Sequence, residues 1–290
     1  MSHAQKSPIA ELEDASKRGA GTGEVIVSTK GVSQVFAAHG TGEDLLALNN
    51  VSVDVRRGEM VALIGPSGCG KSTLLNVIGG LIEPTHGAAF IEGARVRGPA
   101  PKKVAYIFQE SALLPWATIL DNVKVGLEFQ GVAPSARTQR AREALAAAGL
   151  SAAFEKHYPH QLSGGMKQRV ALARALSLKT DILLMDEPFA SLDEQTRMVF
   201  GEELSSLLSK TGKTIILVTH SLAEAVFLSD RIFVFTARPG AIKEIMVIDE
   251  PHPRHPKFMT SDSFNRSRNH LYELLREEVL RSMIEDEAPS

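Results

Sequence analysis

Short runs of apolar residues, each bounded by glycine, proline or polar residues, recur along the chain and predict β-strands. Between two sets of such runs the sequence turns helical: residues 109–168 are rich in Ala and Leu, and Gly149 ends the helix expected at 137–148. Helical segments also alternate with the later strands, which is typical of a mostly parallel sheet. We expect strands at Val25–Ser28, Val51–Val55, Met60–Ile64, Ala88–Ile91, Val104–Phe108, Ile182–Met185, Thr214–Val218 and Arg231–Phe235.

The two ends of the chain show a different pattern. Residues 1–24 mix polar, charged and small residues without an apolar core, which indicates a flexible leader and not a secretory signal. After the last expected strand, the segment PHPRHP breaks regular structure, and a final helix is expected at Phe264–Ile284. That helix places Leu271, Leu275 and Val279 along one stripe, so it should dock on this core or on a partner.

Charge and cysteine content narrow the possible environments. The chain has 32 basic and 34 acidic residues and a net charge of -2, so no global bias argues for binding nucleic acid or an anionic membrane surface. Its single cysteine, Cys69, has no intrachain partner, which favours a reducing cytoplasm. The apolar runs are of strand length, far short of the roughly 18 residues of a membrane span. We therefore expect a chain that does not cross a bilayer.

Residues 65–73 carry the most specific pattern. The sequence GPSGCGKS fits G-x-x-x-x-G-K-[ST], follows an apolar strand and precedes a helix that begins near Lys71. Glycines let the backbone curl around phosphates with its N–H groups inward, and the helix N-terminus favours anions. Lys71 would reach the β- and γ-phosphates, and Ser72 would offer its hydroxyl to Mg²⁺. We predict an Mg-ATP site formed by Gly65, Pro66, Ser67, Gly68, Cys69, Gly70, Lys71, Ser72 and Thr73.

A second candidate element is an apolar strand that ends in two carboxylates, Asp186 and Glu187. A parallel sheet presents such groups at the carboxyl edge of its strands, where ligands bind. Asp186 would hold the metal through water, and Glu187 would orient and polarise the attacking water. Ordinary surface acids at a solvated strand end are the alternative, which the presence of a phosphate loop disfavours.

The stretch QLSGGM, Gln161–Met166, resembles the LSGGQ signature of ABC-type ATPases, with Met166 in place of the usual glutamine. Other elements occur in the order typical of that family, and the resemblance covers about residues 25–250. Gln109 resembles the Q-loop glutamine, Ser191-Leu192-Asp193 the D-loop, His220 the switch histidine, and Phe36 the aromatic residue that stacks on adenine.

The resemblance implies an α/β fold: a P-loop NTPase (ABC ATPase) core with an antiparallel β layer, an inserted α-helical subdomain at about 109–168 and a C-terminal helix. It divides the chain into a leader (1–24), an ATPase domain (25–250) and a linker with the C-terminal helix (251–290). It also implies a head-to-tail dimer. Each ATP would lie between the phosphate loop of one subunit and an anion-binding site of the other, formed by Ser163, Gly164 and Gly165.

The same resemblance implies the catalytic roles. Lys71, Mg²⁺ and Ser163 of the partner subunit would stabilise the charge on the transferring phosphoryl group, while Glu187 positions the water. His220 would bond the γ-phosphate, and Gln109 would sense it beside the metal. The candidate catalytic residues are thus Lys71, Gln109, Glu187 and His220, and the candidate metal ligands are Ser72, Gln109 and Asp186. Met166 removes one side-chain amide from the contact between subunits.

Leu113-Leu114-Pro115-Trp116, with Asp121-Asn122-Val123 and residues 236–240, resembles the ATPases of nitrate, sulfonate, taurine and related bacterial importers. An aromatic loop after Gln109 suits mechanical output, because dimer closure would push it against a bound partner. We predict that Trp116 anchors a membrane subunit; the alternative is a Trp packed inside the helical subdomain. The resemblance implies separate permease subunits, an external solute-binding protein, a small anion as solute, and a peripheral location on the cytoplasmic face of the bacterial inner membrane.

The sequence gives less support to other functions and to other candidate sites. A soluble ABC ATPase acting on nucleic acid or ribosomes usually carries tandem cassettes or long coiled coils, which this sequence lacks, and the signature argues against a kinase or GTPase. His157 and His160 could pair on a metal, but Pro159 spoils helical spacing and no further ligands complete the set. We interpret Cys69 as a tolerated small residue of the loop and not as a nucleophile, although its position at a helix N-terminus could lower the pKa of its thiol; alkylation would then block ATP binding.

Overall fold

The computed structural model describes residues 23–37, 44–190 and 192–287, without the side chains of residues 208 and 284–287. Residues 1–22 of the predicted leader and Ser191 of the predicted D-loop lie outside the described residues. The chain divides into two compact units. We call residues 23–100 and 214–287, as far as they are described, the sheet unit, and residues 101–213 the helical unit.

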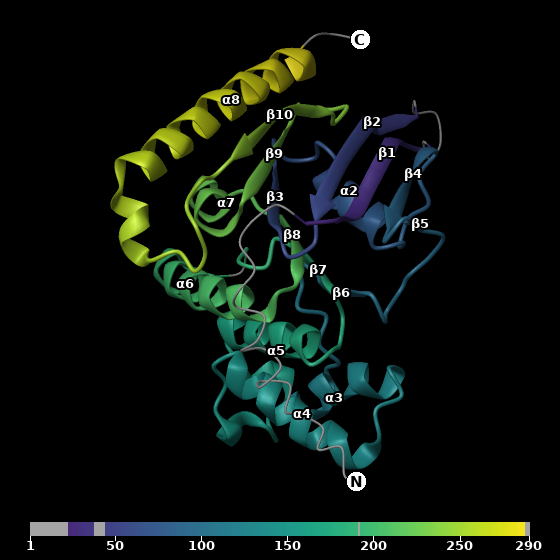
Figure 1. Cartoon of the computed structure of the whole chain (residues 1–290), viewed down its shortest axis with the longest axis vertical. Helices are drawn as coiled ribbons and strands as arrows, with labels where there is room; N and C mark the ends of the chain where they lie inside the picture. Colours follow the sequence, from purple (N-terminus) through teal and green to yellow (C-terminus); the bar gives the residue numbers. More distant parts are fainter. Residues whose placement is uncertain (1–22, 38–43, 191, 288–290) are drawn as a thin grey trace. The chain divides into compact units, whose positions relative to one another are not determined.

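An antiparallel sheet opens the sheet unit, with strand order β2-β1-β4-β5 (Figure 1). Its strands are β1 (Val25–Phe36), β2 (Leu45–Arg56), β4 (His86–Ile91) and β5 (Ala94–Arg95). Within β2, buried Val51, Val53 and Val55 alternate with exposed residues, so one face of the strand packs on the core. Strand β1 continues past the predicted end at Ser28 through a register shift between Thr29 and Val32, an irregularity that hides the alternation in the sequence.

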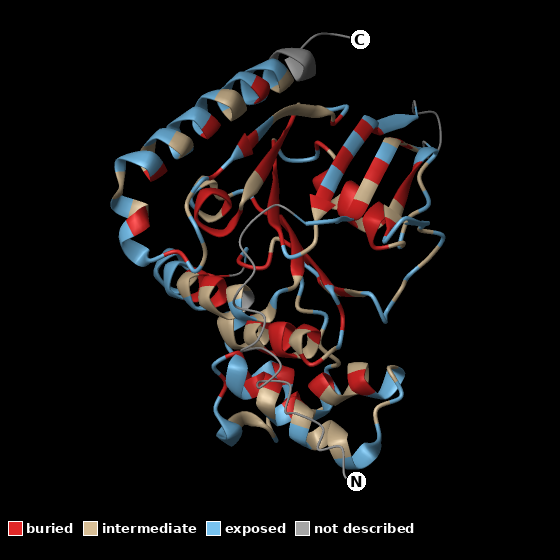
Figure 2. Cartoon of the chain, viewed as in Figure 1, coloured by how far each residue is buried: buried red, intermediate tan, exposed pale blue. Residues whose placement is uncertain are grey.

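The second sheet of this unit is built on the parallel strands β9 (Arg231–Phe235), β3 (Met60–Ile64) and β8 (Thr214–Val218). Every residue of β3 and β8 is buried, as their continuous apolar runs predict (Figure 2). Strand β10 (Ile242–Val247) pairs antiparallel with β9 and was not predicted, because this edge strand carries Lys243 and Glu244. Helix α2 (Lys71–Ile78) contacts β1, β2, β4 and β8, and α7 (Leu222–Leu228) packs on β3.

The predicted C-terminal helix is present as α8 (Asp262–Glu287), after a short 3-10 helix, η4 (Pro256–Thr260). It packs on α7, η4 and β9 of the same chain, which decides between the two docking alternatives. The predicted stripe is wrong in part: Leu271 is buried, but Val279 is exposed. The buried face consists of Phe264, Leu271 and Glu278, spaced by seven residues, so a carboxylate takes the place expected for an apolar side chain.

The helical unit holds the parallel strands β6 (Val104–Ile107) and β7 (Ile182–Asp186). Helices α3 (Ile119–Phe129), α4 (Pro134–Ala147) and α5 (Gly164–Leu176) pack on one another, and α5 also packs on β6 (Figure 1). Two 3-10 turns, η2 (Ala152–Phe154) and η3 (Pro159–Gln161), join α4 to α5, and α6 (Glu194–Thr211) completes the unit. This unit includes the predicted helical insertion.

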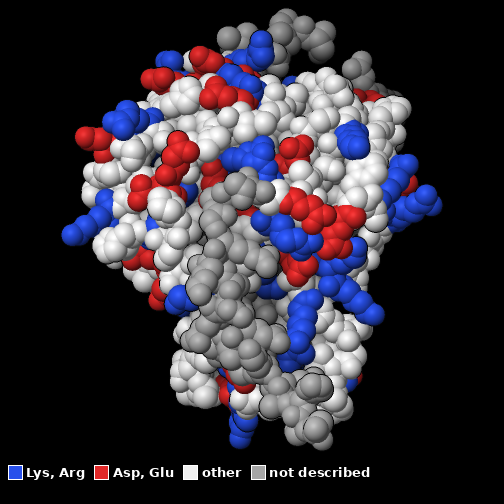
Figure 3. All heavy atoms as spheres, viewed as in Figure 1, with Lys and Arg blue, Asp and Glu red and all other residues white. Residues whose placement is uncertain are grey.

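Two global expectations also concern the described residues. Among them, no helix is both long and apolar enough to span a membrane. On the molecular face that Figure 3 shows, basic and acidic side chains lie interspersed, in keeping with the near balance of the two charges.

Candidate functional site

The phosphate loop connects the buried strand β3 to helix α2 in the sheet unit. Gly68 and Gly70 have φ angles of 74° and 99°, a left-handed conformation that glycine adopts without strain. Gly70 is the N-cap of α2 and provides no side chain to bond the first-turn N–H groups. A Cβ atom at Gly70 would lie 2.7 Å from the Ala47 carbonyl oxygen, so no larger residue fits. The result is a curled backbone whose amides suit the phosphates of a nucleotide.

The Lys71 ammonium lies buried at the centre of this loop. It donates hydrogen bonds to the carbonyl oxygens of Gly65, at 2.9 Å, and Pro66, at 2.8 Å. Both acceptors are neutral carbonyl oxygens, and they hold the cation beside the curled backbone. The charge is therefore available to phosphate oxygens.

The structure favours the interpretation of Cys69 as a small packed residue over the alternative of an activated thiol. Its side chain is buried, and burial raises the pKa of the thiol above its ordinary value despite the opposing Lys71 ammonium at 3.6 Å. The helix N-terminus therefore does not create a reactive thiolate here. Cys69 is a packed residue of the loop, next to Gly65.

In the helical unit, Asp186 and Glu187 stand at the end of the buried strand β7, as predicted. Asp186 is itself buried, and its charge, after burial, is a cause of the raised pKa of Tyr106 on β6. Glu187 has a φ angle of 45°, a left-handed value that a residue with a Cβ rarely adopts. Strain of this kind is found where a side chain must point in one particular direction.

Gln109 and Glu187 are far apart in the sequence, but the structure brings their side chains together. The Gln109 Nε2 donates to Glu187 Oε2 at 3.2 Å. This contact joins the predicted sensor of the γ-phosphate to the residue predicted to polarise the water, within one unit. It orients one oxygen of the Glu187 carboxylate.

Two residues that support Gln109 were missed by sequence reasoning. Gln168, buried on α5, donates through Nε2 to the Gln109 carbonyl oxygen at 3.2 Å. Arg174, six residues further along α5, donates to the carbonyl oxygens of Ser111 at 2.9 Å and Ala112 at 2.8 Å, just after Gln109 in the chain. The only available signal was the spacing of polar residues on the inner face of a predicted helix, which does not reveal their acceptors.

The signature residues form the N-terminus of α5. Ser163 is the N-cap, and its hydroxyl oxygen accepts from the Met166 N–H at 3.4 Å. Ser163 and Gly164 are exposed, so a second molecule can reach them. Within the same unit, a Cβ on Gly165 would lie 3.3 Å from Leu192 of the predicted D-loop. Asp193 caps α6, and its bonds from Thr196 lower the pKa of the carboxyl group.

The remaining nucleotide candidates lie in the sheet unit. His220 is exposed between β8 and α7, where the backbone is held by the Thr219 hydroxyl, which accepts from the Ser221 N–H at 3.0 Å. Phe36 ends β1 with 38% of its surface exposed, enough to offer a ring face. The roles that the resemblance implies for His220 and Phe36 stay predictions.

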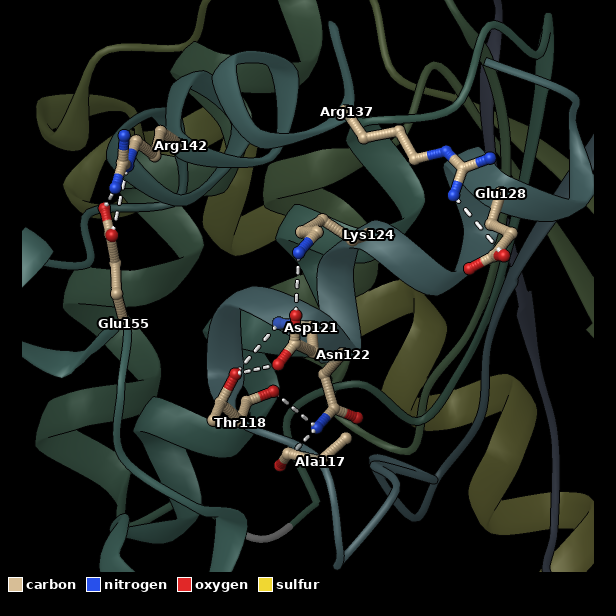
Figure 4. A network of polar contacts seen from close by, with 9 residues as sticks. All are labelled: Ala117, Thr118, Asp121, Asn122, Lys124, Glu128, Arg137, Arg142 and Glu155. Carbon is tan, nitrogen blue, oxygen red and sulfur yellow. Dashed lines mark hydrogen bonds and ion pairs between the residues drawn. The ribbon is translucent and has the colours of Figure 1, made fainter. Parts of the chain in front are cut away.

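A different kind of site surrounds Trp116. Its side chain is 74% exposed, so the alternative of a Trp packed inside the helical subdomain is wrong. The loop before it is held by Asn122, a fully buried residue at the start of α3. Its Oδ1 accepts from the Leu114 N–H at 2.7 Å, and its Nδ2 donates to the Leu114 carbonyl oxygen at 3.1 Å. The same Nδ2 lies 3.1 Å from the carbonyl oxygen of Ala117 and 3.0 Å from that of Thr118 (Figure 4).

Ion pairs brace the helices behind this loop. Thr118 caps α3 and bonds Asp121, which pairs with Lys124 at 2.8 Å (Figure 4). Arg137 pairs with Glu128 at 3.4 Å, and Arg142 of α4 pairs with Glu155 at 3.0 Å. The helices behind the Trp116 loop are thus connected to each other by ion pairs.

Comparisons with known proteins place this geometry in a family. A sequence profile described as ABC transporter matches residues 48–190. The chain is 44% identical to the uncharacterised ABC transporter ATP-binding protein MJ0412 of Methanocaldococcus jannaschii, with 90% of this chain and 95% of that protein covered. Among solved structures, the dimeric ATP-binding cassette MJ0796 bound to ADP and Pi has a TM-score of 0.70 and 35% identity, with 78% of this chain and 100% of that chain covered.

The chain belongs to the ATP-binding proteins of ABC transporters. It binds ATP and hydrolyses it in connection with transport, and the predicted α/β P-loop fold is confirmed. It is also 39% identical to the nitrate transport protein NasD of Klebsiella oxytoca, with 90% of this chain and 97% of that protein covered. Identity to the taurine import ATP-binding protein TauB of Rhizobium johnstonii is 44%, covering 72% and 79%. The resemblance to this importer group, first based on Leu113–Trp116, is confirmed.

Proposed function

We propose that this chain is the ATP-hydrolysing subunit of an importer for a small anion. The observation that carries the proposal is the phosphate loop around Lys71, with curled glycine backbone, an uncapped helix start and a buried ammonium. The relatives NasD and TauB support the importer class, because their names specify nitrate transport and taurine import. These comparisons offer no support for the alternative of a soluble ATPase that acts on nucleic acid or ribosomes.

The residues present suit a magnesium nucleotide. Ser72, in the first turn of α2, carries a hydroxyl, and Asp186 carries a carboxylate at the end of β7. Mg²⁺ prefers such oxygen donors and takes its remaining ligands from phosphates and water. We assign Ser72, Asp186 and Gln109 as the residues that would hold the metal, which would neutralise charge on the phosphates when bound. Phe36 stacks on the adenine ring, and residues 65–73 hold the phosphates.

Hydrolysis then depends on orientation of the water. Glu187 accepts a hydrogen bond from the water, and Gln109 keeps the Glu187 carboxylate in its direction. Lys71 stabilises the charge on the transferring phosphoryl group, and His220 bonds the γ-phosphate beside it. Since Gln109 leads directly into the loop that carries Trp116, movement at the γ-phosphate is transmitted to that loop.

A second copy of the chain completes the site in this proposal. Ser163 and Gly164 are exposed at the start of α5, where the N–H groups favour an anion. We assign them, with Gly165, to the γ-phosphate of the ATP bound by the partner subunit. The dimeric MJ0796 cassette, of which this chain covers 100%, supports such an assembly.

The dimer can be tested with a substitution that keeps the helix cap. Asp is as good an N-cap as Ser, so Ser163→Asp should preserve α5 and its stability while a carboxylate repels the γ-phosphate. In a Glu187→Gln background that hydrolyses ATP slowly, light scattering with Mg-ATP should show dimers, and Ser163→Asp should leave monomers. Ser151→Asp, at the other Ser cap of this unit on η2, is the matched control and should dimerise normally. If the protein with Ser163→Asp dimerises as tightly as the Glu187→Gln protein without it, the assignment is wrong.

Transport can be tested in cells that lack the gene for this chain. Uptake of labelled nitrate, taurine and an alkanesulfonate should be measured separately, and one of the three should be lost. The wild-type gene should restore that uptake, and a Lys71→Ala variant of equal abundance should not. Normal uptake of all three in the deletion strain would remove the small-anion proposal while leaving the ATPase untouched.

The proposed role at the membrane does not require a transmembrane helix in this chain. We propose that two permease subunits bind it around Leu113 to Trp116, that an external solute-binding protein joins the same complex, and that the chain lies peripherally on the cytoplasmic face of the inner membrane. Co-purification of multi-span membrane proteins with the wild-type chain would support this, whereas recovery of ribosomes or nucleic acid instead would favour the alternative.

A further inference from the structure

The loop after β9 packs directly against the phosphate loop within the sheet unit. A Cβ atom on Gly65 would lie 2.8 Å from the Cβ of Phe235, and a Cβ on Gly240 would collide with the Cys69 carbonyl oxygen. Arg238 Nε donates to the Gly68 carbonyl oxygen at 3.3 Å. Residues 235–240 therefore contact the phosphate loop at Gly65, Gly68 and Cys69. We call them the supporting loop.

The supporting loop has a fixed shape. Thr236 and Ala241 exchange hydrogen bonds across its base, and the Thr236 hydroxyl also donates to the Pro239 carbonyl oxygen at 3.0 Å. Gly240 bonds β2 on both sides, with its N–H to Ala47 and its carbonyl oxygen to Asn49. These bonds fix the base of the loop and Gly240, but they do not include the buried N–H of Ala237.

The C-terminal helix provides the acceptor for the Ala237 N–H. Glu278 of α8, a buried carboxylate, accepts from the Ala237 N–H through Oε2 at 2.8 Å. Its other oxygen, Oε1, pairs with Lys243 Nζ of β10 at 2.9 Å. Burial opposes ionisation of Glu278, but the bonds from Lys243 and Ala237 prevail and hold the pKa of the carboxyl group below its ordinary value. A charged acceptor makes the stronger hydrogen bond to the amide.

The helix itself is held firmly enough to act as a support. At its start, Phe264 stacks edge-to-face on Phe258 of η4, with ring centroids 5.3 Å apart. Further along, His270 bonds Glu244 of β10 at 2.7 Å, and Leu271 is fully buried. Helix α8 runs alongside the strands on either side of the supporting loop (Figure 1). The position of Glu278 is thus set by contacts along the whole helix.

We propose that Glu278 is a positioning residue for ATP binding: from the C-terminal helix it fixes the supporting loop, and through Arg238 and Gly240 the conformation of the phosphate loop. Glu278 touches no nucleotide in this account. The inference rests on the proposed assignment of residues 65–73 to the phosphates. Without the carboxylate, the Ala237 N–H would be buried without an acceptor, and the supporting loop would shift to reach water.

The neighbouring Glu277 provides a matched control. It pairs with the same Lys243 Nζ, at 2.6 Å, but has no bond to Ala237 and is exposed. Glu278→Ala should raise the Kd for Mg-ATP, measured by calorimetry on the full chain, about tenfold, since one buried amide loses its acceptor. Glu278→Gln retains a neutral acceptor and should restore most of the affinity. Glu277→Ala should leave the Kd unchanged.

Kinetics separates positioning from general destabilisation. The KM for ATP should rise in Glu278→Ala while kcat is retained at saturating ATP, because the catalytic groups are not altered. If Glu278→Ala does not fold, Arg238→Met tests the same path from its exposed end and should also raise the Kd. Combined with Glu278→Gln, Arg238→Met should give less than the sum of the two separate effects on binding.

The outcomes also distinguish this inference from the function on which it rests. If Lys71→Ala binds Mg-ATP as tightly as the wild-type chain, the assigned phosphate loop is wrong. If Lys71→Ala loses ATP while Glu278→Ala and Arg238→Met both retain wild-type Kd and KM values, only the inference is overturned. Equal effects of Glu277→Ala and Glu278→Ala would overturn it as well, because the ion pair with Lys243 would then explain both.

Discussion

The phosphate loop and the loop that ends in Trp116 are both fixed in their backbones, but they present opposite surfaces. In the phosphate loop the Lys71 side chain is buried, and the curled main chain presents its N–H groups. Around Trp116 the main chain is bonded inward by Asn122, and the side chain projects with 74% of its surface exposed. A small charged ligand needs an ordered array of N–H groups, whereas a protein partner needs a large side chain to insert.

The two loops also differ in what fixes them. The phosphate loop is held by glycine conformation and by the supporting loop from a distant part of the sequence. The Trp116 loop is held by nearby residues of α3 and by Arg174 of α5. Substitutions at the first loop should therefore change ATP chemistry, and substitutions at the second should change stability or partner binding.

The largest effect is expected from the buried lysine. Lys71→Ala should lower kcat for ATP hydrolysis by about 10²–10³-fold, because a fixed positive donor to the transferring phosphoryl group is lost. Lys124→Ala, near the second loop, removes a partly exposed ammonium that pairs with Asp121 and should leave kcat unchanged. Steady-state phosphate release measures both. A comparable loss of kcat in Lys124→Ala would show that the two loops do not differ in their effect on ATP hydrolysis.

The second effect concerns folding. Asn122→Ala leaves the Leu114 N–H and several carbonyl oxygens without their partner, so the free energy of unfolding should fall by about 1–3 kcal/mol. Urea denaturation followed by circular dichroism measures the change. Gln139→Ala, which removes an exposed bond to Glu143 on α4, should be neutral. A neutral Asn122→Ala would mean that the loop is not held in this way.

Trp116→Ala should weaken binding to the membrane subunits by about tenfold or more, as expected for an aromatic anchor at the centre of an interface. Basal ATP hydrolysis and the melting temperature should not change, because the side chain is exposed. Phe129→Ala, at a residue 84% exposed at the end of α3, is the matched control for loss of surface apolar area. If only Phe129→Ala weakens binding in detergent pull-down assays, the interface lies at that end of α3.

The smallest effect is expected from thiol chemistry. Because burial raises the pKa of Cys69, its thiol should stay protonated between about pH 7 and 8.5, where a free cysteine begins to ionise. Iodoacetamide should therefore leave ATP binding almost unaltered in this range, and mass spectrometry should find Cys69 labelled only after denaturation. Rapid labelling of the native chain, with loss of ATP binding, would restore the activated thiol that the structure rejects.

Much of the fold was predictable because the signals are local. The continuous apolar runs at Met60–Ile64 and Thr214–Val218 gave the observed bounds of β3 and β8, since a strand buried on both faces needs no alternation. Strand β10 was missed because an edge strand tolerates charge. The stripe on α8 was wrong in part because it was drawn from apolar residues alone, whereas Glu278 is buried, and its partners Ala237 and Lys243 make that burial favourable.

By itself the sequence determined the phosphate loop, the acids that end β7, and the family resemblance, because each depends on residues adjacent along the chain. Only the tertiary structure decided how these elements are held: the bond between Gln109 and Glu187, the display of Trp116 by Asn122, and the support of the phosphate loop by the C-terminal helix. The physical reason is that a buried N–H or carboxylate takes whichever partner the fold brings within about 3 Å, and spacing along the chain does not specify that partner.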